Sequence, residues 1–189
     1  LIVKNFSSNF LINTILISGA FYLFFITLRD FFIKGFKNLA QNTAHFGFSL
    51  LILSILFNNL FSTETITNLK VGETFENSKT KIIFENISQK EEKNYKSIIA
   101  EFTIQDSKGK MENLSPELRI YNQPNIVTSE ADIKTTLLSD KFIVINLVPN
   151  QEFFNVRYQV KPFMLWIWIS VILISVGGLM SFLKKEYEK

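Results

Sequence analysis

The side chain best suited to chemistry is His45, the one histidine of the chain, which lies in the apolar stretch Leu39–Phe61. If this stretch is helical, three other polar residues follow the same side at helical spacing: Asn38, Gln41 and Ser49. A polar stripe on a membrane-crossing helix should face protein, cofactor or water rather than lipid. The spacing therefore predicts that His45 lies in a functional interface, with Gln41 and Ser49 as supporting residues.

A neutral imidazole is a good axial ligand for haem iron, and Gln41 or Asn42 could orient the other ring nitrogen of His45. The small residues Ala44 and Gly47 would let a neighbouring helix or a flat ring approach the backbone closely. One histidine cannot form a bis-histidine site. The other conventional haem ligands besides tyrosine are Met111, Met164 and Met180, and none is obviously opposite, so the second ligand is expected from a helix outside this chain. The alternative is a structural histidine that hydrogen-bonds a neighbouring helix.

The composition excludes several other kinds of site. Because the chain has no cysteine, disulfides, thiolate metal sites and thioether attachment of haem to this chain are excluded. The absence of a second histidine leaves no base–orienter pair of the usual catalytic kind. The formal net charge of +3 gives no reason to expect a nucleic-acid partner.

Three apolar stretches are long enough to cross a lipid bilayer: Phe10–Leu28, Leu39–Phe61 and Phe163–Leu183. A helix of about 23 residues extends about 34 Å, against a hydrocarbon core of roughly 30 Å. Trp166 and Trp168 lie near the start of the last stretch, where aromatic belts form. Gly177-Gly178 further along predicts close helix packing.

Positive charge predicts the topology. The loop expected at Arg29–Asn38 has three basic residues and one acidic residue, and Lys184, Lys185 and Lys189 lie at the other end of the chain. The positive-inside rule places both segments in the cytoplasm. Three crossings then place the N-terminus and the segment Ser62–Pro162 on the opposite side.

The segment Ser62–Pro162 is predicted to be rich in β-strands, because it contains short runs of Ile, Val, Phe and Tyr. The expected strands are Lys79–Ser88, Lys96–Gln105, a strand from Met111, Ile120–Tyr121, Lys141–Val148 and Glu152–Val160. Asp106–Lys110 has the composition of a hairpin turn, and a short helix is expected around Glu130–Leu137. Arg119 is interpreted as a surface strand residue, with a carboxylate or propionate ligand as the alternative.

The expected fold is an integral membrane protein with about three transmembrane α-helices and an extracytoplasmic β-rich domain, a small antiparallel barrel or sandwich. Its expected parts are a first helix with a cytoplasmic loop (1–38) and the histidine-bearing helix (39–61). The β-rich domain (62–162) follows, and then a last helix with a cytoplasmic tail (163–189).

Several short motifs occur in order along the chain: Ala44–Gly47 (A-H-x-G), Gly72-Glu73, Pro116–Tyr121, Ser129–Ile133, and Lys161–Phe163 with Trp166-Ile167-Trp168. Together they resemble the C-terminal part of CcmF, the membrane haem-lyase component of System I cytochrome c maturation. Leu118 stands where the family usually has lysine in a P-E-K-R-x-Y motif, and Asp140-Lys-Phe142 replaces an aspartate-leucine-tyrosine motif.

This resemblance implies that His45 is one of two transmembrane histidines that ligate a b-type haem, which helps to reduce the haem about to be attached. The family's WWD segment, its external haem-ligating histidines and the other transmembrane histidine have no counterpart here. The chain would then be a C-terminal fragment or one product of a split gene, and would not be catalytic alone. The implied partners are the N-terminal part of the lyase, a haem chaperone and apocytochrome c.

The implied location is a bacterial or organelle inner membrane, with the β domain on the periplasmic side and the C-terminus in the cytoplasm. Two other functions stay open at this stage. One is a non-catalytic, membrane-anchored binding or assembly module in which His45 is structural. The other is a b-haem redox subunit with no role in cytochrome maturation.

Overall fold

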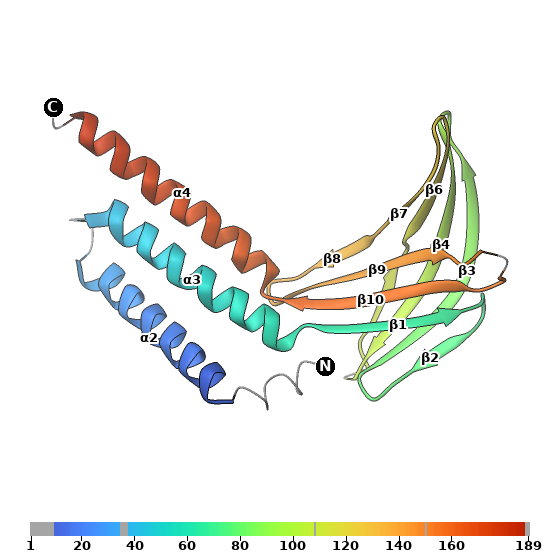
Figure 1. Cartoon of the computed structure of the whole chain (residues 1–189), viewed down its shortest axis with the longest axis horizontal. Helices are drawn as coiled ribbons and strands as arrows, with labels where there is room; N and C mark the ends of the chain where they lie inside the picture. Colours follow the sequence, from blue (N-terminus) through green and yellow to red (C-terminus); the bar gives the residue numbers. More distant parts are fainter. Residues whose placement is uncertain (1–9, 35–37, 108, 150, 188–189) are drawn as a thin grey trace. The chain divides into compact units, whose positions relative to one another are not determined.

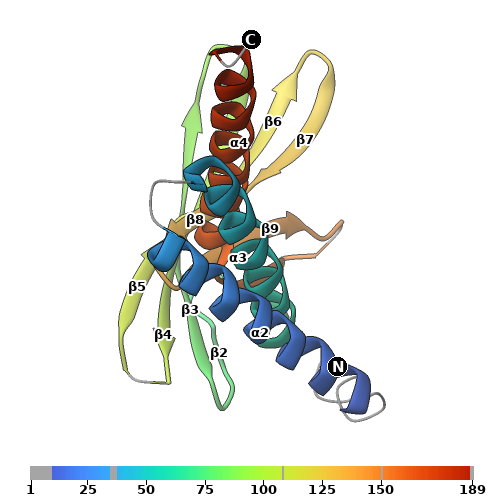
Figure 2. The ribbon, with the colours of Figure 1, turned by 90° about the vertical axis from the view of Figure 1, so that its left-hand side faces the viewer.

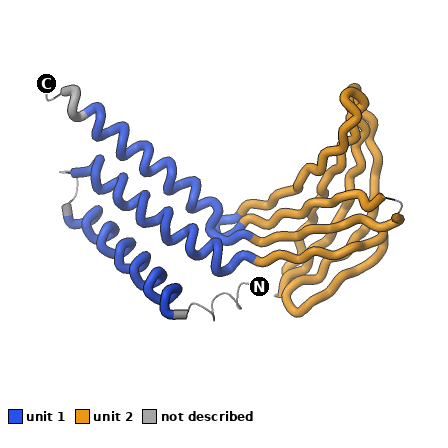
Figure 3. Tube along the Cα trace, in the orientation of Figure 1, with its two compact units in different colours: residues 1–62, 136–139, 161–189 blue, residues 63–135, 140–160 orange. Residues whose placement is uncertain are grey.

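The computed structural model describes residues 10–34, 38–107, 109–149 and 151–187. The chain divides into two compact units (Figure 3). The first holds residues 1–62, 136–139 and 161–189, and the second holds residues 63–135 and 140–160. The division follows the expected separation between apolar helices and a β-rich segment.

The described helices are α2 (Phe10–Lys34), α3 (Leu39–Phe61) and α4 (Met164–Tyr187) (Figure 1). Each is long and apolar enough to cross a membrane, with mean hydropathies of 2.0, 1.6 and 2.1, which confirms the three predicted spans. The helix α2 continues to Lys34 instead of ending at Leu28, so the predicted loop was too long. The last turns of α2 contain the apolar residues Phe31–Ile33. The ring of Phe31 packs against the Phe46 ring of α3, with 5.8 Å between centroids, which stabilises this extension.

The helix α3 packs against both α2 and α4 (Figure 2). Its contact with α4 is close because both helices present small residues there. A Cβ atom on Gly177 would lie only 2.6 Å from the backbone nitrogen of Ala44, and one on Gly47 would lie 2.9 Å from the backbone nitrogen of Ile174. Small residues drive helix association in lipid by letting the backbones approach. The packing role predicted for Gly177 is confirmed.

Asn58, which interrupts the apolar run near the end of α3, forms two kinds of backbone contact. Its side-chain amide donates to the carbonyl of Pro162 at 2.7 Å, and its own carbonyl accepts from the backbone N–H of Ser62 at 3.0 Å. The residue therefore connects the end of α3 to the chain just before α4. Its polarity is explained by these hydrogen bonds.

The described residues between α3 and α4 form two antiparallel sheets. One sheet has the order β1-β10-β9-β8, and the other has the order β2-β3-β4-β6-β7, with β5 also paired to β4. The strands are β1 (Thr63–Leu69), β2 (Thr74–Glu76), β3 (Thr80–Glu91), β4 (Tyr95–Asp106), β5 (Met111–Leu114), β6 (Glu117–Asn122), β7 (Asn125–Glu130), β8 (Asp132–Thr135), β9 (Ser139–Leu147) and β10 (Phe154–Pro162).

The predicted strands are present, and the hairpin turn at Asp106–Lys110 joins β4 to β5. Gly109 occupies a left-handed conformation there, with φ of +79°. The helix predicted around Glu130–Leu137 is wrong, because this segment contains β8, which pairs with β9. Interstrand hydrogen bonds and cross-strand contacts have outweighed the local helix preference.

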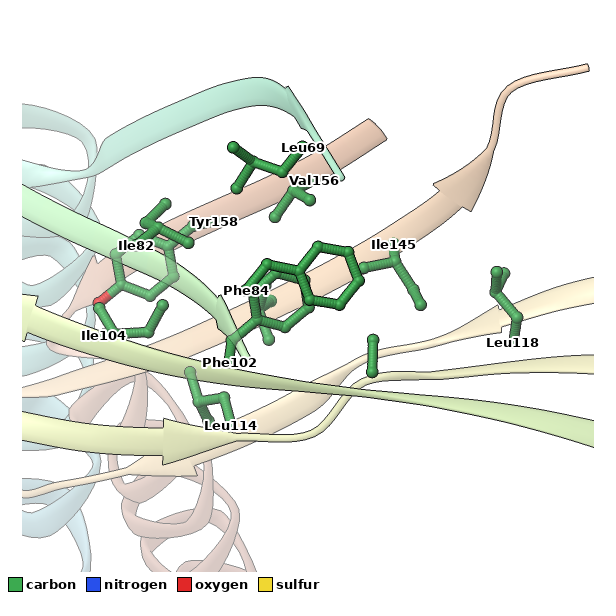
Figure 4. Packing of buried hydrophobic residues seen from close by; sticks show 12 residues of the cluster. Leu69, Ile82, Phe84, Phe102, Ile104, Leu114, Leu118, Ile145, Val156 and Tyr158 are labelled. Carbon is green, nitrogen blue, oxygen red and sulfur yellow. The ribbon is translucent and has the colours of Figure 1, made fainter. Parts of the chain in front are cut away.

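A single apolar core lies between the two sheets, as Figure 4 shows. The Phe84 and Phe102 rings stack at 4.4 Å between centroids, and both side chains are fully buried. Ile145 and Val156 of the other sheet belong to the same buried cluster. Buried residues alternate along β4, as expected for a strand with one face on a core. The predicted barrel or sandwich is therefore a sandwich.

Gly177 and Gly178 form a matched pair for testing the α3–α4 contact. A Cβ atom on Gly178 would meet nothing within 4 Å, whereas one on Gly177 would collide with the backbone of α3. We expect Gly177→Ala to destabilise the helical unit by about 1–3 kcal/mol through overpacking, and Gly178→Ala to be neutral or slightly stabilising. The measurement is thermal unfolding of the detergent-solubilised protein, and equal effects of the two substitutions would contradict the described packing.

Candidate functional site

His45 lies on α3, which has one side packed against α4, one side packed against α2 and one exposed side. The side toward α4 consists of Ala44, Gly47 and neighbouring small residues, which contact Gly177 and the α4 backbone. The close approach that Ala44 and Gly47 permit is therefore used by a helix. A flat ring could not occupy the same space without displacing α4.

The side of α3 toward α2 contains a buried polar contact. The hydroxyl oxygens of Ser49 and Thr27 lie 2.6 Å apart, and the Ser49 hydroxyl is also 2.8 Å from the carbonyl of Phe46. The Ser49 side chain has no exposed surface, and the Phe46 ring beside it packs on Phe24 at 5.7 Å. Hydrogen bonds between helices specify their relative rotation in a membrane.

The third side of α3 is exposed in the described structure. Its members recur at helical spacing and include two apolar side chains: Gln41, His45, Phe48, Ile55 and Asn59. Phe48 and Ile55 are each about half exposed, at 53% and 50%. His45 thus lies on an exposed helix side, with both polar and apolar residues, that neither α2 nor α4 covers. We call these five residues the histidine face of α3.

The structure separates the predicted polar stripe. Gln41 and His45 lie one turn apart on the histidine face, whereas Ser49 is buried against Thr27 of α2. Asn42 is also buried, and its amide lies 3.5 Å from the carbonyl of Asp30. Gln41 is therefore the predicted partner that remains beside His45. At ideal helical spacing Ser49 lies at the edge of the predicted stripe, and in the structure this edge packs against Thr27 of α2.

The histidine face fits one axial side of a haem. Its imidazole is accessible from outside the helix, and the apolar side chains of Phe48 and Ile55 lie on the same side, where they could contact a porphyrin ring. Among the described residues, no cluster of His, Cys, Asp and Glu could hold a metal ion by itself. A haem with two histidine ligands would need the second histidine from outside this chain, which has one.

Arg119, the other residue singled out in the sequence, lies in a network on β6. Its guanidinium pairs with Glu117 at 3.0 Å and lies 5.2 Å from the centre of the Tyr95 ring. The hydrogen bond from Arg119 outweighs partial burial and lowers the pKa of the Glu117 carboxyl, with a further hydrogen bond from Ser97. These contacts account for Arg119 as a residue of strand β6.

A buried ion pair was missed by the sequence analysis. Glu112 of β5, with only 2% of its side chain exposed, accepts from Lys141 of β9 at 2.8 Å and pairs with Lys110 at 2.9 Å. Burial acts to raise the pKa of Glu112, but the hydrogen bonds from both lysines outweigh it and lower that pKa. Burial, together with the negative charge of Glu112, raises the pKa of Tyr158. The sequence does hold a signal for the burial of Glu112. Side chains of a strand alternate between its two faces, so Glu112 lies on the same face as the apolar Leu114, which is buried.

Comparison with known proteins identifies the family. The model of the family described as CcmF C-terminal beta-sandwich matches residues 60–162, more than half of the 189-residue chain. The chain belongs to this family. The resemblance found from the motifs is thereby confirmed, and the chain corresponds to the C-terminal part of CcmF.

Individual relatives agree with the CcmF assignment. The cytochrome c-type biogenesis protein CcmF of Haemophilus influenzae is 26% identical over 166 residues, which cover 85% of this chain and 26% of that protein. CcmF of Escherichia coli is 26% identical over 77% of this chain and 23% of that protein. The chain therefore spans about a quarter of the length of these relatives.

A solved structure named cytochrome c heme lyase CcmF has the same fold. The TM-score is 0.63 with 15% sequence identity, over 90% of this chain and 34% of that one. At this identity the likeness concerns the fold, and it includes the helices as well as the sandwich because it covers most of the chain. The predicted membrane protein with a β-rich domain is confirmed.

Lys141 and Lys110 allow the buried pair of this CcmF segment to be tested. Lys141 keeps 15% of its side chain exposed and Lys110 keeps 63%. We expect Lys141→Met to destabilise the sandwich by about 3 kcal/mol, because it strips a partner from a buried carboxylate, and Lys110→Met to have a much smaller effect. The measurement is thermal unfolding of the full chain in detergent, followed by the β signal in circular dichroism. A larger effect at Lys110 would contradict this assignment.

The lowered pKa of Glu112 predicts a dependence on pH. Because the pKa is below its ordinary value of 4.5 in the folded state, the stability from this carboxylate is present above pH 4.5 and is lost as the pH falls through the folded pKa. The stability advantage of the wild type over Glu112→Gln should therefore shrink below pH 4.5. Thermal unfolding of both proteins between pH 7 and 3 measures it, and a constant difference would rule out this contribution.

Proposed function

We propose that the chain is the C-terminal portion of a cytochrome c haem lyase, as a fragment or a split subunit, and that His45 is one axial ligand of a b-type haem. The observation that carries the proposal is the position of His45 on the exposed side of α3, away from both α2 and α4. An ionisable side chain on a spanning helix is costly against lipid, which favours a protein or cofactor neighbour. Membership of the CcmF family supports a haem as that neighbour.

The chemical role of His45 follows from its ring. In its neutral form one nitrogen donates a lone pair to the iron, and the other carries a proton that a neighbour can hold in place. Gln41 lies one turn away on the same face, and its side-chain carbonyl is the proposed acceptor of a hydrogen bond from that N–H. When bound, the haem would supply an electron to the haem that is about to be attached to apocytochrome c.

Ser49 has a different proposed role. Its hydroxyl is engaged with Thr27 and the Phe46 carbonyl, so it supports the site through the rotation of α3 about its own axis. A change in this rotation would redirect His45, which is one turn before Ser49 on the helix. Ser49 is therefore a positioning residue in this proposal.

The remaining parts of the site would come from outside the chain. The second axial ligand and the WWD segment belong to the proposed N-terminal portion of the lyase, which also receives haem from its chaperone and binds apocytochrome c. The chain is not catalytic alone in this proposal. The β sandwich would lie on the periplasmic side of a bacterial or organelle inner membrane, with the C-terminus in the cytoplasm, as the distribution of positive charge favours.

The test is the visible spectrum of the detergent-solubilised complex, purified through a tag on this chain. We expect a low-spin b-type spectrum that is lost or strongly changed in His45→Ala, because the iron loses a nitrogen ligand. The matched control is Ile172→Ala, which changes an exposed apolar residue of α4 outside the histidine face. Gln41→Ala should retain the haem but shift its reduction potential, since the ligand loses a hydrogen-bond partner.

Three results would contradict the proposal. An unchanged spectrum with full haem content in His45→Ala would remove this residue from the site. A well-folded wild-type complex without haem would favour a non-catalytic assembly module. Normal cytochrome c levels in a strain that lacks the chain would favour a redox subunit without a role in maturation.

A further inference from the structure

Two exposed leucines lie in the turn between β8 and β9. Leu137 and Leu138 are 69% and 66% exposed, although both are large and apolar. The turn Thr136–Ser139 belongs to the same compact unit as the helices (Figure 3). Neither leucine belongs to the buried core of the β-sandwich, so burial in that core does not explain why these two residues are apolar.

Internal hydrogen bonds keep this turn tight. The Thr136 backbone N–H donates to the Ser139 carbonyl at 3.0 Å, and the Ser139 backbone N–H donates to the Thr136 hydroxyl oxygen at 3.1 Å. The Thr136 hydroxyl also donates to the Ser139 carbonyl at 2.7 Å. These bonds pair the polar groups of Thr136 and Ser139 on either side of the two leucines, so fewer polar groups of the turn need water as a partner.

Two further hydrogen bonds fix the turn to the beginning of α4. The Leu138 carbonyl accepts from the backbone N–H of Phe163 at 2.8 Å, and the Leu137 carbonyl accepts from the indole Nε1–H of Trp166 at 2.8 Å. Phe163 has φ of 60°, a strained value for an aromatic residue, and its ring packs 5.1 Å from the Phe57 ring of α3. The leucines are therefore held at the level where the apolar helix begins.

We propose that Leu137 and Leu138 insert into the interfacial region of the lipid bilayer beside the start of α4, so that the turn is an additional membrane contact. The apolar surroundings at this level favour lipid as the occupant. Phe61 at the end of α3 and Trp168 in the first turns of α4 are 60% and 61% exposed. Tryptophan is enriched where a helix enters the headgroup region, and an apolar turn at the same level meets the acyl boundary. The inference rests on the membrane-spanning helices and is independent of haem binding by His45.

The absence of cysteine from the chain permits a direct test. Leu138→Cys carries a nitroxide spin label in the complex reconstituted into bilayers, and collisions with oxygen and with a water-soluble nickel chelate are compared. Met111→Cys is the matched control, because Met111 is an equally exposed apolar residue (63%) on β5 of the sandwich. We expect an oxygen-to-nickel collision ratio several-fold higher at position 138 than at position 111, since oxygen concentrates in lipid and the chelate stays in water.

Each other outcome overturns the proposal. A high nickel collision rate at position 138 would place the turn in water. Low collision rates with both reagents would place it against a protein partner.

The support from Trp166 is tested separately in the same labelled protein. Trp166→Phe removes the donor to Leu137 and should increase label mobility at position 138, whereas Trp168→Phe should not. Equal mobility in the two variants would show that Trp166 does not hold the turn.

Discussion

The close contact between α3 and α4 decides which side of α3 is available for a site. Within hydrocarbon there is no hydrophobic drive to associate, so small residues that let two backbones meet determine the packing. Ala44 and Gly47 of α3 meet Gly177 and the backbone of α4 at this contact. The Ser49–Thr27 hydrogen bond fixes the opposite flank against α2. These two contacts leave His45 on the exposed side of α3.

The sandwich obeys a different physical rule, because most of its stability comes from burial of apolar side chains between two sheets. Phe84 and Phe102 stack at the centre of that core. The Glu112–Lys141 pair joins strands of the two sheets within it. A buried pair of this kind adds less to stability than it costs to break, and such pairs can specify one register. Arg119 on β6 pairs with Glu117 and Glu130, but these groups are more exposed than Glu112, so their pairing costs less desolvation.

Several motifs that resemble the CcmF family have a structural explanation near the start of α4. The proline of Lys161-Pro162-Phe163 offers its carbonyl to Asn58, and the next residue turns the chain with a positive φ. Trp166 donates to the turn at Leu137. These residues hold together the ends of two apolar helices and an exposed apolar turn. The motif is therefore explained by the geometry of chain entry into the helix, without a catalytic role for these residues.

The sequence by itself determined the three apolar spans, most strands, the hairpin at Asp106–Lys110 and the family, because periodicity, turn chemistry and local motifs are encoded over short distances. It could also place Gln41 beside His45, since helical spacing alone does so. Only the tertiary structure decided that Ser49 faces α2, that Gly47 serves α4 and that Glu112 is buried, because each depends on contacts between segments distant in the chain. The segment around Glu130–Leu137 is a different case, because β8 pairs with the next strand, β9, across a short turn. The pairing is local in sequence, and the local helix preference was wrongly favoured over this hairpin.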